Sequence, residues 1–385
     1  MRKSRASHLF QIFSADQKNG QSCFLFLGHP GNSSWLRFFN VILPAGISFY
    51  TFQTLSYIID VYNEAAPAET NFWEFAAFVS FFPHLIAGPL TRHHQLIPQL
   101  KRIREEGPSP RWDEGVLLFA VGLCKKTLLA DRIGNFIDPR LGDFSTVGLP
   151  LAWLLMASYA LQIYFDFSGY SDMAIGLGRF FGIELPQNFN SPYQAVNPSD
   201  FWHRWHITLS QWLRDYLYIP LGGSRKGKFR SLVNLAITMF LGGLWHGAKW
   251  IFALWGLYHG ILLVLYHIAQ PAWDRLHIPL RRAFTFVLVC WGWVLFRSPT
   301  LFEARKWYAS ALGAYGLLLN HLTTDDLQLA GLTLTGLAIV IWAPVASRYE
   351  GFRNLSPAKQ CALGAVSVFA ILFMNYSSKF LYFQF

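Results

Sequence analysis

The chain has 385 residues, of which 53% are hydrophobic and 14% are charged, and its formal net charge is +10. Soluble domains carry about 25% charged residues, so this composition excludes an ordinary soluble protein. The positive charge gathers in short segments at 92–111, 225–230 and 275–282. No aromatic and basic module of the kind that binds nucleic acid accompanies it, so we predict no nucleic-acid partner.

The first residues, 1–36, are basic and then mixed and polar, with a brief apolar run at 24–27. That run is too short for the core of a signal peptide. We interpret 1–36 as a basic, poorly ordered N-terminal lead-in on the cytoplasmic side. No sequence repeat or hydrophilic linker divides the remainder, so we predict one membrane domain over 37–385.

Long stretches without Asp, Glu, Lys or Arg recur through that domain. A membrane-crossing helix needs about 17–25 mostly apolar residues, so we predict seven to nine crossings. In lipid, a segment that is not part of a closed barrel must be helical to satisfy its backbone hydrogen bonds. The alternation of apolar and polar residues that marks an outer-membrane barrel is absent. The sequence therefore predicts an all-α, polytopic helical membrane protein. The stretches are 38–59, 75–91, 144–165, 231–248, 250–273, 307–324, 327–347 and 360–378, with shorter candidates at 115–130 and 283–296.

Charge placement predicts the orientation of these crossings. Between 60 and 74 the chain carries acidic residues and no Lys or Arg, whereas 92–111 is basic. Basic loops stay in the cytoplasm under the positive-inside rule. With the N-terminus in the cytoplasm, each basic segment falls on the cytoplasmic side, and the stretch 75–91 separates 92–111 from the acidic loop.

Residues 166–230 form the least lipid-like part of the domain, and prolines break it into short pieces. Ser199 or Asp200 is predicted to cap a helix that runs to about Tyr218. That helix would carry an aromatic stripe and, beside it, a second stripe that contains His203 and His206. An interfacial helix with its Trp and Tyr side chains at headgroup level is the alternative. The aromatic stripe comprises Trp202, Trp205, Leu209, Trp212 and Tyr216.

A second histidine, His246, ends an uncharged apolar run between Trp245 and Gly247. On a helix from Ser231 it would share a face with Gly242. Because glycine has no side chain, another helix or a ligand can approach the backbone closely there. A histidine there is costly and suggests chemistry; a core histidine bonded to a carbonyl is the alternative. We interpret the other isolated histidines as structural: His84, His93, His94, His259 and His267.

Two buried histidines suit acyl transfer, because a neutral imidazole can take a proton from an acceptor hydroxyl. Metal binding needs closely spaced ligands such as HExxH, and the four cysteines are scattered, so no metal site is predicted. The run 167–171 does not supply the Gly-x-Ser-x-Gly elbow of a serine hydrolase. The candidate catalytic residues are His206 and His246.

Several long motifs, in order, are similar to those of the membrane-bound O-acyltransferase family and of its bacterial alginate O-acetyltransferase branch. The resemblance covers about 38–385. It implies that His246 matches the near-invariant catalytic histidine of the family and that His206 matches the second active-site position. The motifs are Ile42–Gln53, Pro83–Pro89, Tyr164–Gly176, Asn188–Tyr193, Phe201–Gly223, Leu244–Ala248 and Phe380–Phe385.

The resemblance implies a multi-pass acyltransferase of the bacterial inner (cytoplasmic) membrane with no bound cofactor. Acetyl-CoA would donate acetyl groups on the cytoplasmic side, and periplasmic acetyltransferase partners would receive them for an exported polysaccharide, alginate. His246 would act as general base, and His206 would position the thioester or stabilise charge. Three alternatives stay open: acetylation of peptidoglycan or another glycan, D-alanyl transfer to teichoic acid, and a transporter with a proton relay.

One departure from the family concerns the N-terminus. Family members usually carry further membrane helices before the motif at Ile42. We expect that this chain starts inside a longer gene or that its N-terminus is divergent.

A shared site also conflicts with simple topology. The fifteen residues from Ser231 to His246 would span about 22 Å of helix, which places His246 far from a surface-bound His206. We therefore predict that part of 186–222 re-enters the membrane, or that the 231–248 helix is broken or begins deeper. Broken or re-entrant helices would then surround a central funnel, with the two imidazoles within about 15 Å of each other.

Overall fold

The computed structural model describes residues 46–374 apart from 87, 143, 145, 248, 320, 321, 349 and 350. By internal contacts the chain divides into two compact units, Met1–Ser48 and Phe49–Phe385. Only 46–48 of the first unit are described, so the lead-in predicted at 1–36 lies outside the described residues. The second unit is helical, and the described residues contain no strand, which confirms the all-α prediction.

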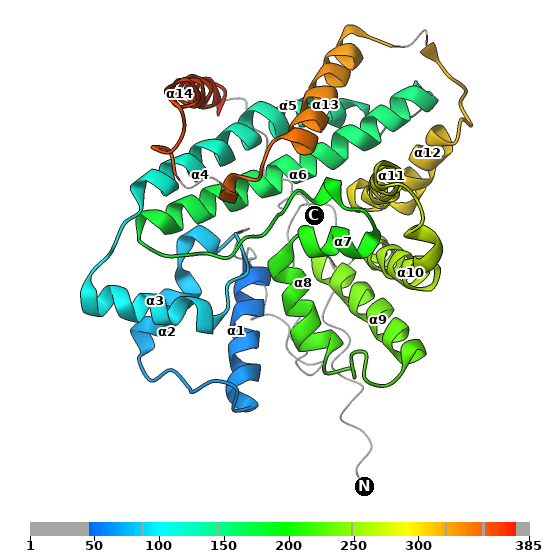
Figure 1. The fold of residues 1–385 in the computed structure, drawn as a ribbon. Helices are drawn as coiled ribbons and strands as arrows, with labels where there is room; N and C mark the ends of the chain where they lie inside the picture. The colour runs from blue at the N-terminus through cyan, green and yellow to red at the C-terminus, as the bar shows by residue number, and fades with distance from the viewer. Residues whose placement is uncertain are drawn as a thin grey trace, which may run out of the picture. The chain divides into compact units, whose positions relative to one another are not determined.

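The helices are labelled as in Figure 1. Two of the segments between them, Lys125–Ala130 and Arg214–Tyr218, are π-helical and continue the α-helices that precede them. The α-helices are α1 Ile47–Tyr62, α2 Phe72–Ser80, α3 His93–Glu106, α4 Trp112–Cys124, α5 Asp131–Ile137, α6 Leu149–Phe180, α7 Pro198–Arg204, α8 Ile207–Leu213, α9 Lys228–His246, α10 Trp250–Trp273, α11 Ile278–Arg297, α12 Leu301–Ala311, α13 Thr324–Trp342 and α14 Pro357–Leu372.

Helix α6 is the central element of the second unit, and α4, α5, α11, α12 and α13 all pack against it (Figure 1). Most of its residues are buried around the whole circumference, as expected for a helix at the centre of a packed unit. Glycines bring α4 and α6 together: a Cβ on Gly122 would lie 2.4 Å from the carbonyl oxygen of Gly169. Close backbone approach of this kind holds helices together without bulky side chains.

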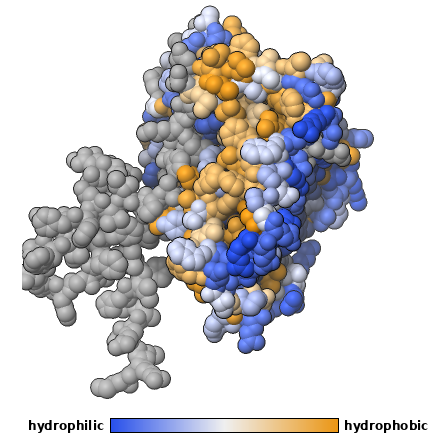
Figure 2. Space-filling model, turned by 90° about the vertical axis from the view of Figure 1, so that its left-hand side faces the viewer, coloured by the Kyte–Doolittle hydropathy of each residue, from blue (hydrophilic) through white to orange (hydrophobic). Residues whose placement is uncertain are grey.

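Three described helices, α10, α11 and α13, are long and apolar enough to cross a membrane, and α14 is a shorter apolar helix. They overlap the stretches predicted at 250–273, 283–296, 327–347 and 360–378. Figure 2 shows one face on which hydrophobic side chains form a broad band with hydrophilic residues beside it. Large apolar side chains are exposed on these helices, including Leu334 and Trp342, as lipid contact requires.

Two predicted crossings are wrong. The stretch 75–91 contains the end of α2, which stops at Ser80, and a short 3-10 helix at Phe82–His84. The stretch 307–324 contains the end of α12, after which Gly313 and Gly316 adopt φ of +85° and +73°. Glycine adopts these left-handed conformations without steric cost, so the chain turns where the lack of charge had suggested a span.

Helix α6 extends beyond the uncharged stretch 144–165 into the polar region and ends at Phe180. Its carboxylates are balanced by two lysines of the π-helical segment: Lys126 Nζ lies 2.6 Å from Asp166, and Lys125 Nζ lies 2.6 Å from Asp172. Burying paired charges costs far less than burying isolated ones. Helix α6 can therefore continue through a polar stretch.

The predicted separation of the acidic and basic segments is wrong as well. Lys101 Nζ on α3 lies 2.7 Å from Glu69 and 3.4 Å from Glu74, and Arg104 pairs with Glu74. The hydrogen bond from Lys101 holds the pKa of Glu69 below its ordinary value. Helix α2 has nine residues and is too short to cross a membrane. The acidic and basic segments therefore lie on the same side of the membrane.

Close packing of α9 on α10 makes a stability prediction possible. A Cβ on Gly256 would lie 2.3 Å from the Met239 carbonyl oxygen and 2.9 Å from Gly243 Cα. Gly256→Ala must therefore push two backbones apart, and overpacking typically costs about 1–3 kcal/mol. We expect a lower temperature at which the detergent-purified protein loses its monodisperse gel-filtration peak.

Gly364→Ala on α14 is the matched control, because a Cβ there would meet nothing within 4 Å. Replacing glycine by alanine in an open helical position stabilises slightly. Equal melting temperatures for the two variants would contradict the close-packing account.

Candidate active site

His206 lies at a break between two short helices. Asn197 caps α7 by accepting a hydrogen bond from the Asp200 amide at 2.7 Å. Helix α7 then ends at Arg204, His206 adopts the left-handed conformation (φ 43°, ψ 54°), and α8 begins at Ile207. The predicted cap at Ser199 or Asp200 and the predicted single helix to Tyr218 are therefore wrong. A non-glycine residue in this conformation costs of order 1–3 kcal/mol, which surrounding contacts must offset.

Those contacts are made by Asn188. His206 is buried, and its Nδ1 lies 3.1 Å from Asn188 Oδ1. The same oxygen accepts hydrogen bonds from the Thr208 amide at 3.3 Å and the Thr208 hydroxyl at 2.9 Å. Asn188 Nδ2 in turn donates to Ser171 Oγ on α6 at 3.3 Å. The break at His206 is thus anchored to the central helix.

This network determines the tautomer of His206. A backbone N–H such as that of Thr208 can only donate, so the Asn188 atom that faces it must be the amide oxygen. His206 Nδ1 consequently donates to that oxygen and carries the proton of the neutral ring. His206 Nε2 then holds a lone pair, and within the described part of the chain it is buried without a hydrogen-bond partner. The sequence reasoning missed Asn188, whose only signal was its place in the motif 188–193.

His246 is the last residue of α9, and its half-buried ring is surrounded by aromatic side chains. Ring centroids lie 4.9 Å away for Trp245, 5.1 Å for Trp255 on α10, and 5.2 Å for Phe296 on α11. The glycines of α9 and α10 allow the close packing that brings these rings together. Apolar surroundings of this kind strengthen the hydrogen bonds and electrostatic interactions made within them.

Trp245 contacts both histidines. Its ring centroid is 6.4 Å from that of His206 and 4.9 Å from that of His246, so the two imidazoles are at most about 11 Å apart. The predicted separation of less than 15 Å is confirmed. Helix α9 is continuous, so the proposed break in 231–248 is wrong. The break lies in 186–222, the other alternative, and brings His206 beside the C-terminal end of α9.

The other histidines lie outside this pair. His203 is exposed on α7 and lines a separate cavity of about 330 Å³. His259 is buried among aromatic rings, with the Trp255 and Trp202 centroids 5.0 and 5.2 Å away. His84 Nδ1 lies 3.3 Å from the Thr91 hydroxyl. These positions agree with the structural interpretation of His84 and His259.

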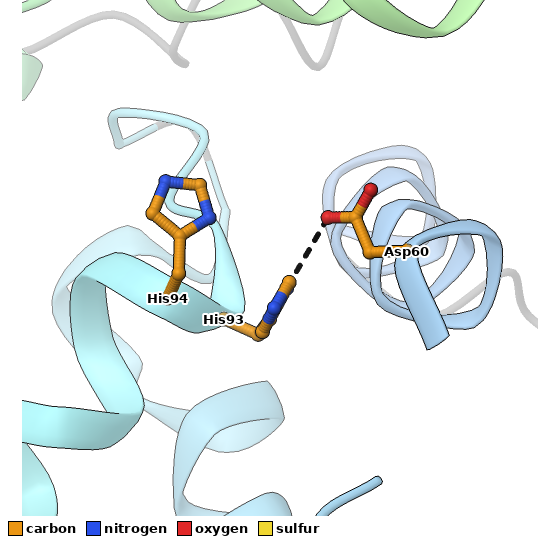
Figure 3. A group of neighbouring side chains, drawn as sticks. All are labelled: Asp60, His93 and His94. Atoms are coloured by element: carbon orange, nitrogen blue, oxygen red, sulfur yellow. Dashed lines mark ion pairs between the residues drawn. The ribbon is translucent and has the colours of Figure 1, made fainter. Parts of the chain in front are cut away.

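Three further ionisable side chains lie together, and the sequence reasoning did not predict this. Asp60 near the end of α1 faces His93 and His94 in the first turn of α3 (Figure 3). The eleven residues from Phe49, which stacks on His206, to Asp60 correspond to roughly 16 Å of helix. This group lines a cavity of about 700 Å³ and is distinct from the His206–His246 pair.

Comparison with known proteins identifies the family. Residues 61–297, more than half of the chain and including both candidate histidines, match MBOAT, the membrane-bound O-acyltransferase family. The chain belongs to this family of membrane proteins.

Three relatives illustrate the similarity. The chain is 44% identical over 323 residues to the probable alginate O-acetylase AlgI of Azotobacter vinelandii, covering 82% of this chain and 62% of the relative. It is 40% identical over 378 residues to the Pseudomonas putida protein of the same name, covering 90% and 76%. It is 40% identical over 315 residues to the peptidoglycan O-acetyltransferase of Helicobacter pylori, covering 74% and 60%. The chain thus spans about three fifths of the first and third of these relatives.

Proposed function

We propose that this protein is an O-acetyltransferase of the bacterial inner membrane that passes acetyl groups from cytoplasmic acetyl-CoA towards hydroxyls of exported alginate. The observation that carries the proposal is the buried His206, within about 11 Å of His246. Asn188 orients its ring through Nδ1, and among the described residues its buried Nε2 has no hydrogen-bond partner. The family and the alginate O-acetylase relatives support the reaction class and the polymer.

His246 acts as the general base in the proposed reaction. The hydroxyl that accepts the acetyl group attacks the thioester carbonyl, and the imidazole removes its proton as the new ester bond forms. The C–S bond then breaks, and the CoA thiolate leaves and takes up a proton. In reactions of this class, preorganised hydrogen-bond donors in a site that excludes water stabilise the negative charge that develops on the carbonyl oxygen.

The tautomer of His206 refines its expected role. With its proton on Nδ1, the neutral ring presents Nε2 as an acceptor only. It can therefore orient a hydroxyl group by accepting its hydrogen bond, and it cannot donate one to the thioester oxygen. The attacking hydroxyl has one proton and gives it to His246, so we assign His206 to positioning the acceptor through a second hydroxyl in place of polarising the donor.

Transfer across the membrane requires a receiver on the other side. In the proposed pathway the acetyl group passes to periplasmic acetyltransferase partners of a polysaccharide export system, which act on the polymer. Peptidoglycan is the second candidate acceptor, favoured by the 40% identity to the peptidoglycan O-acetyltransferase of H. pylori.

We expect proteoliposomes containing the purified protein to release CoA from acetyl-labelled acetyl-CoA, with the label appearing on a hydroxyl acceptor. The matched control is His246→Ala in vesicles with the same protein content. A transporter would move the donor with its thioester intact, so transport of intact acetyl-CoA without CoA release would contradict the proposal.

Deleting the gene distinguishes the acceptors. Loss of ester-linked acetate from exported alginate, with peptidoglycan acetate unchanged, is the expected result. Loss from peptidoglycan alone would transfer the proposal to the second candidate, and loss of D-alanyl esters would exclude both.

A further inference from the structure

The group formed by Asp60, His93 and His94 brings three potential metal ligands together. One ligand atom from each residue lies within 4.8 Å of the other two. Figure 3 shows the three side chains converging from α1 and α3 on one gap. His93 Nδ1 lies 3.6 Å from Asp60 Oδ2, which is too long for a hydrogen bond. Two atoms bound at about 2 Å to the same zinc ion lie roughly 3–4 Å apart.

The buried nitrogen of His93 is the second observation. His93 is 7% exposed, and among the described residues its Nδ1 has no hydrogen-bond partner although it faces a carboxylate. Buried polar atoms are almost always hydrogen-bonded or bound to an ion.

The surrounding charges permit a cation. Arg92 is the nearest basic residue in sequence, and it forms an ion pair of 2.6 Å with Asp215. Lys101 is paired with Glu69 at 2.7 Å. Both basic side chains are therefore paired with a carboxylate other than Asp60, although Asp215 is shared with Arg214. The carboxylate of Asp60 remains to offset the charge of a bound ion.

A neighbouring side chain orients the carboxylate. The Tyr216 hydroxyl donates to Asp60 Oδ2 at 2.7 Å. Hydrogen bonds from outside the ligand set hold metal-binding carboxylates in position in this way. The cavity of about 700 Å³ adjoins all three residues, so further coordination positions would face open space.

We propose that Asp60, His93 and His94 bind a divalent cation of the Zn²⁺ class and leave at least one coordination position open to the cavity. Two imidazole nitrogens and one carboxylate are a ligand set that Zn²⁺ accepts, whereas Mg²⁺ and Ca²⁺ prefer oxygen ligands alone. The ion links the end of α1 to the start of α3. This site is independent of the proposed acyl transfer.

The test uses the full chain in detergent, purified with a tag that contains no histidine. After chelator treatment and gel filtration, the protein is titrated with Co²⁺ and followed by visible absorption, and then with Zn²⁺ in competition. We expect one equivalent of Co²⁺ with visible bands that Zn²⁺ displaces. Added Zn²⁺ should also raise the melting temperature, because a ligand that binds the folded state stabilises it.

Variants locate the ion. His93→Gln and Asp60→Asn should each weaken Co²⁺ binding at least tenfold, whereas the control His203→Gln, an exposed histidine on α7, should leave it unchanged. Loss of binding in His203→Gln to the same extent would overturn the assignment. If a variant aggregates, the titration of the wild-type protein still tests the proposal. A wild-type protein that shows no Co²⁺ bands displaced by Zn²⁺ would contradict it. Neither readout depends on acyl transfer.

Discussion

Replacing His246 by alanine should reduce acetyl transfer by about 10²–10⁴-fold, the contribution of general-base assistance. The ring is held between Trp245, Trp255 and Phe296, and alanine supplies no group there that could take a proton. The measurement is CoA release per unit of protein in proteoliposomes. The loss should appear in kcat, because the proton is transferred in the chemical step.

The control for this variant is a second histidine of the same bundle. His267→Ala on α10 removes an imidazole whose Nδ1 lies 2.7 Å from a backbone oxygen of its own helix, and it should retain near-normal transfer. Both variants should insert in the membrane and elute from gel filtration as wild type does. Wild-type rates in His246→Ala would exclude His246 as the base.

Composition predicted the elements that depend on simple burial. The uncharged stretch 250–273 coincides with α10, and 231–248 lies almost wholly within α9. In these segments apolar length alone requires a helix. The same criterion failed at 307–324, where Gly313 and Gly316 turn the chain, because lack of charge does not distinguish a helix from an apolar loop.

The break at His206 could not be predicted from local pattern. The aromatic spacing from Trp202 to Tyr216 continues through it without interruption, so periodicity favours one helix. What stabilises the break is tertiary: Asn188 precedes His206 by eighteen positions, and Ser171 lies on α6. Motif resemblance identified the two histidines, but the tautomer of His206 depends on bonds that only the fold brings together.

Replacing His206 by alanine should also lower transfer strongly, because the hydroxyl-orienting nitrogen is lost. His203→Ala, three positions earlier, is the matched control and should have little effect, since that side chain is exposed and lines a different cavity. Comparable rates of CoA release in proteoliposomes for the two variants would contradict the assignment of His206.

Asn188 tests the proposed tautomer directly. Asn188→Leu removes the oxygen that accepts from His206 Nδ1 and the Thr208 hydroxyl, so we expect a loss approaching that of His206→Ala. Asn188→Asp keeps an accepting oxygen and should retain much of the rate. The added negative charge beside Nδ1 stabilises the protonated ring, and the acid limb of the pH–rate profile should therefore move to higher pH.

Asn190→Asp is the charge control for this shift. Asn190 lies two positions away in the same segment, where its backbone pairs with Arg204. Its substitution should leave the pH–rate profile in place. A merely structural role for Asn188 would lower the rate without moving the acid limb. An unshifted profile in Asn188→Asp would therefore reject the orientation of His206 by this amide, because a carboxylate in contact with Nδ1 cannot leave its protonation unchanged.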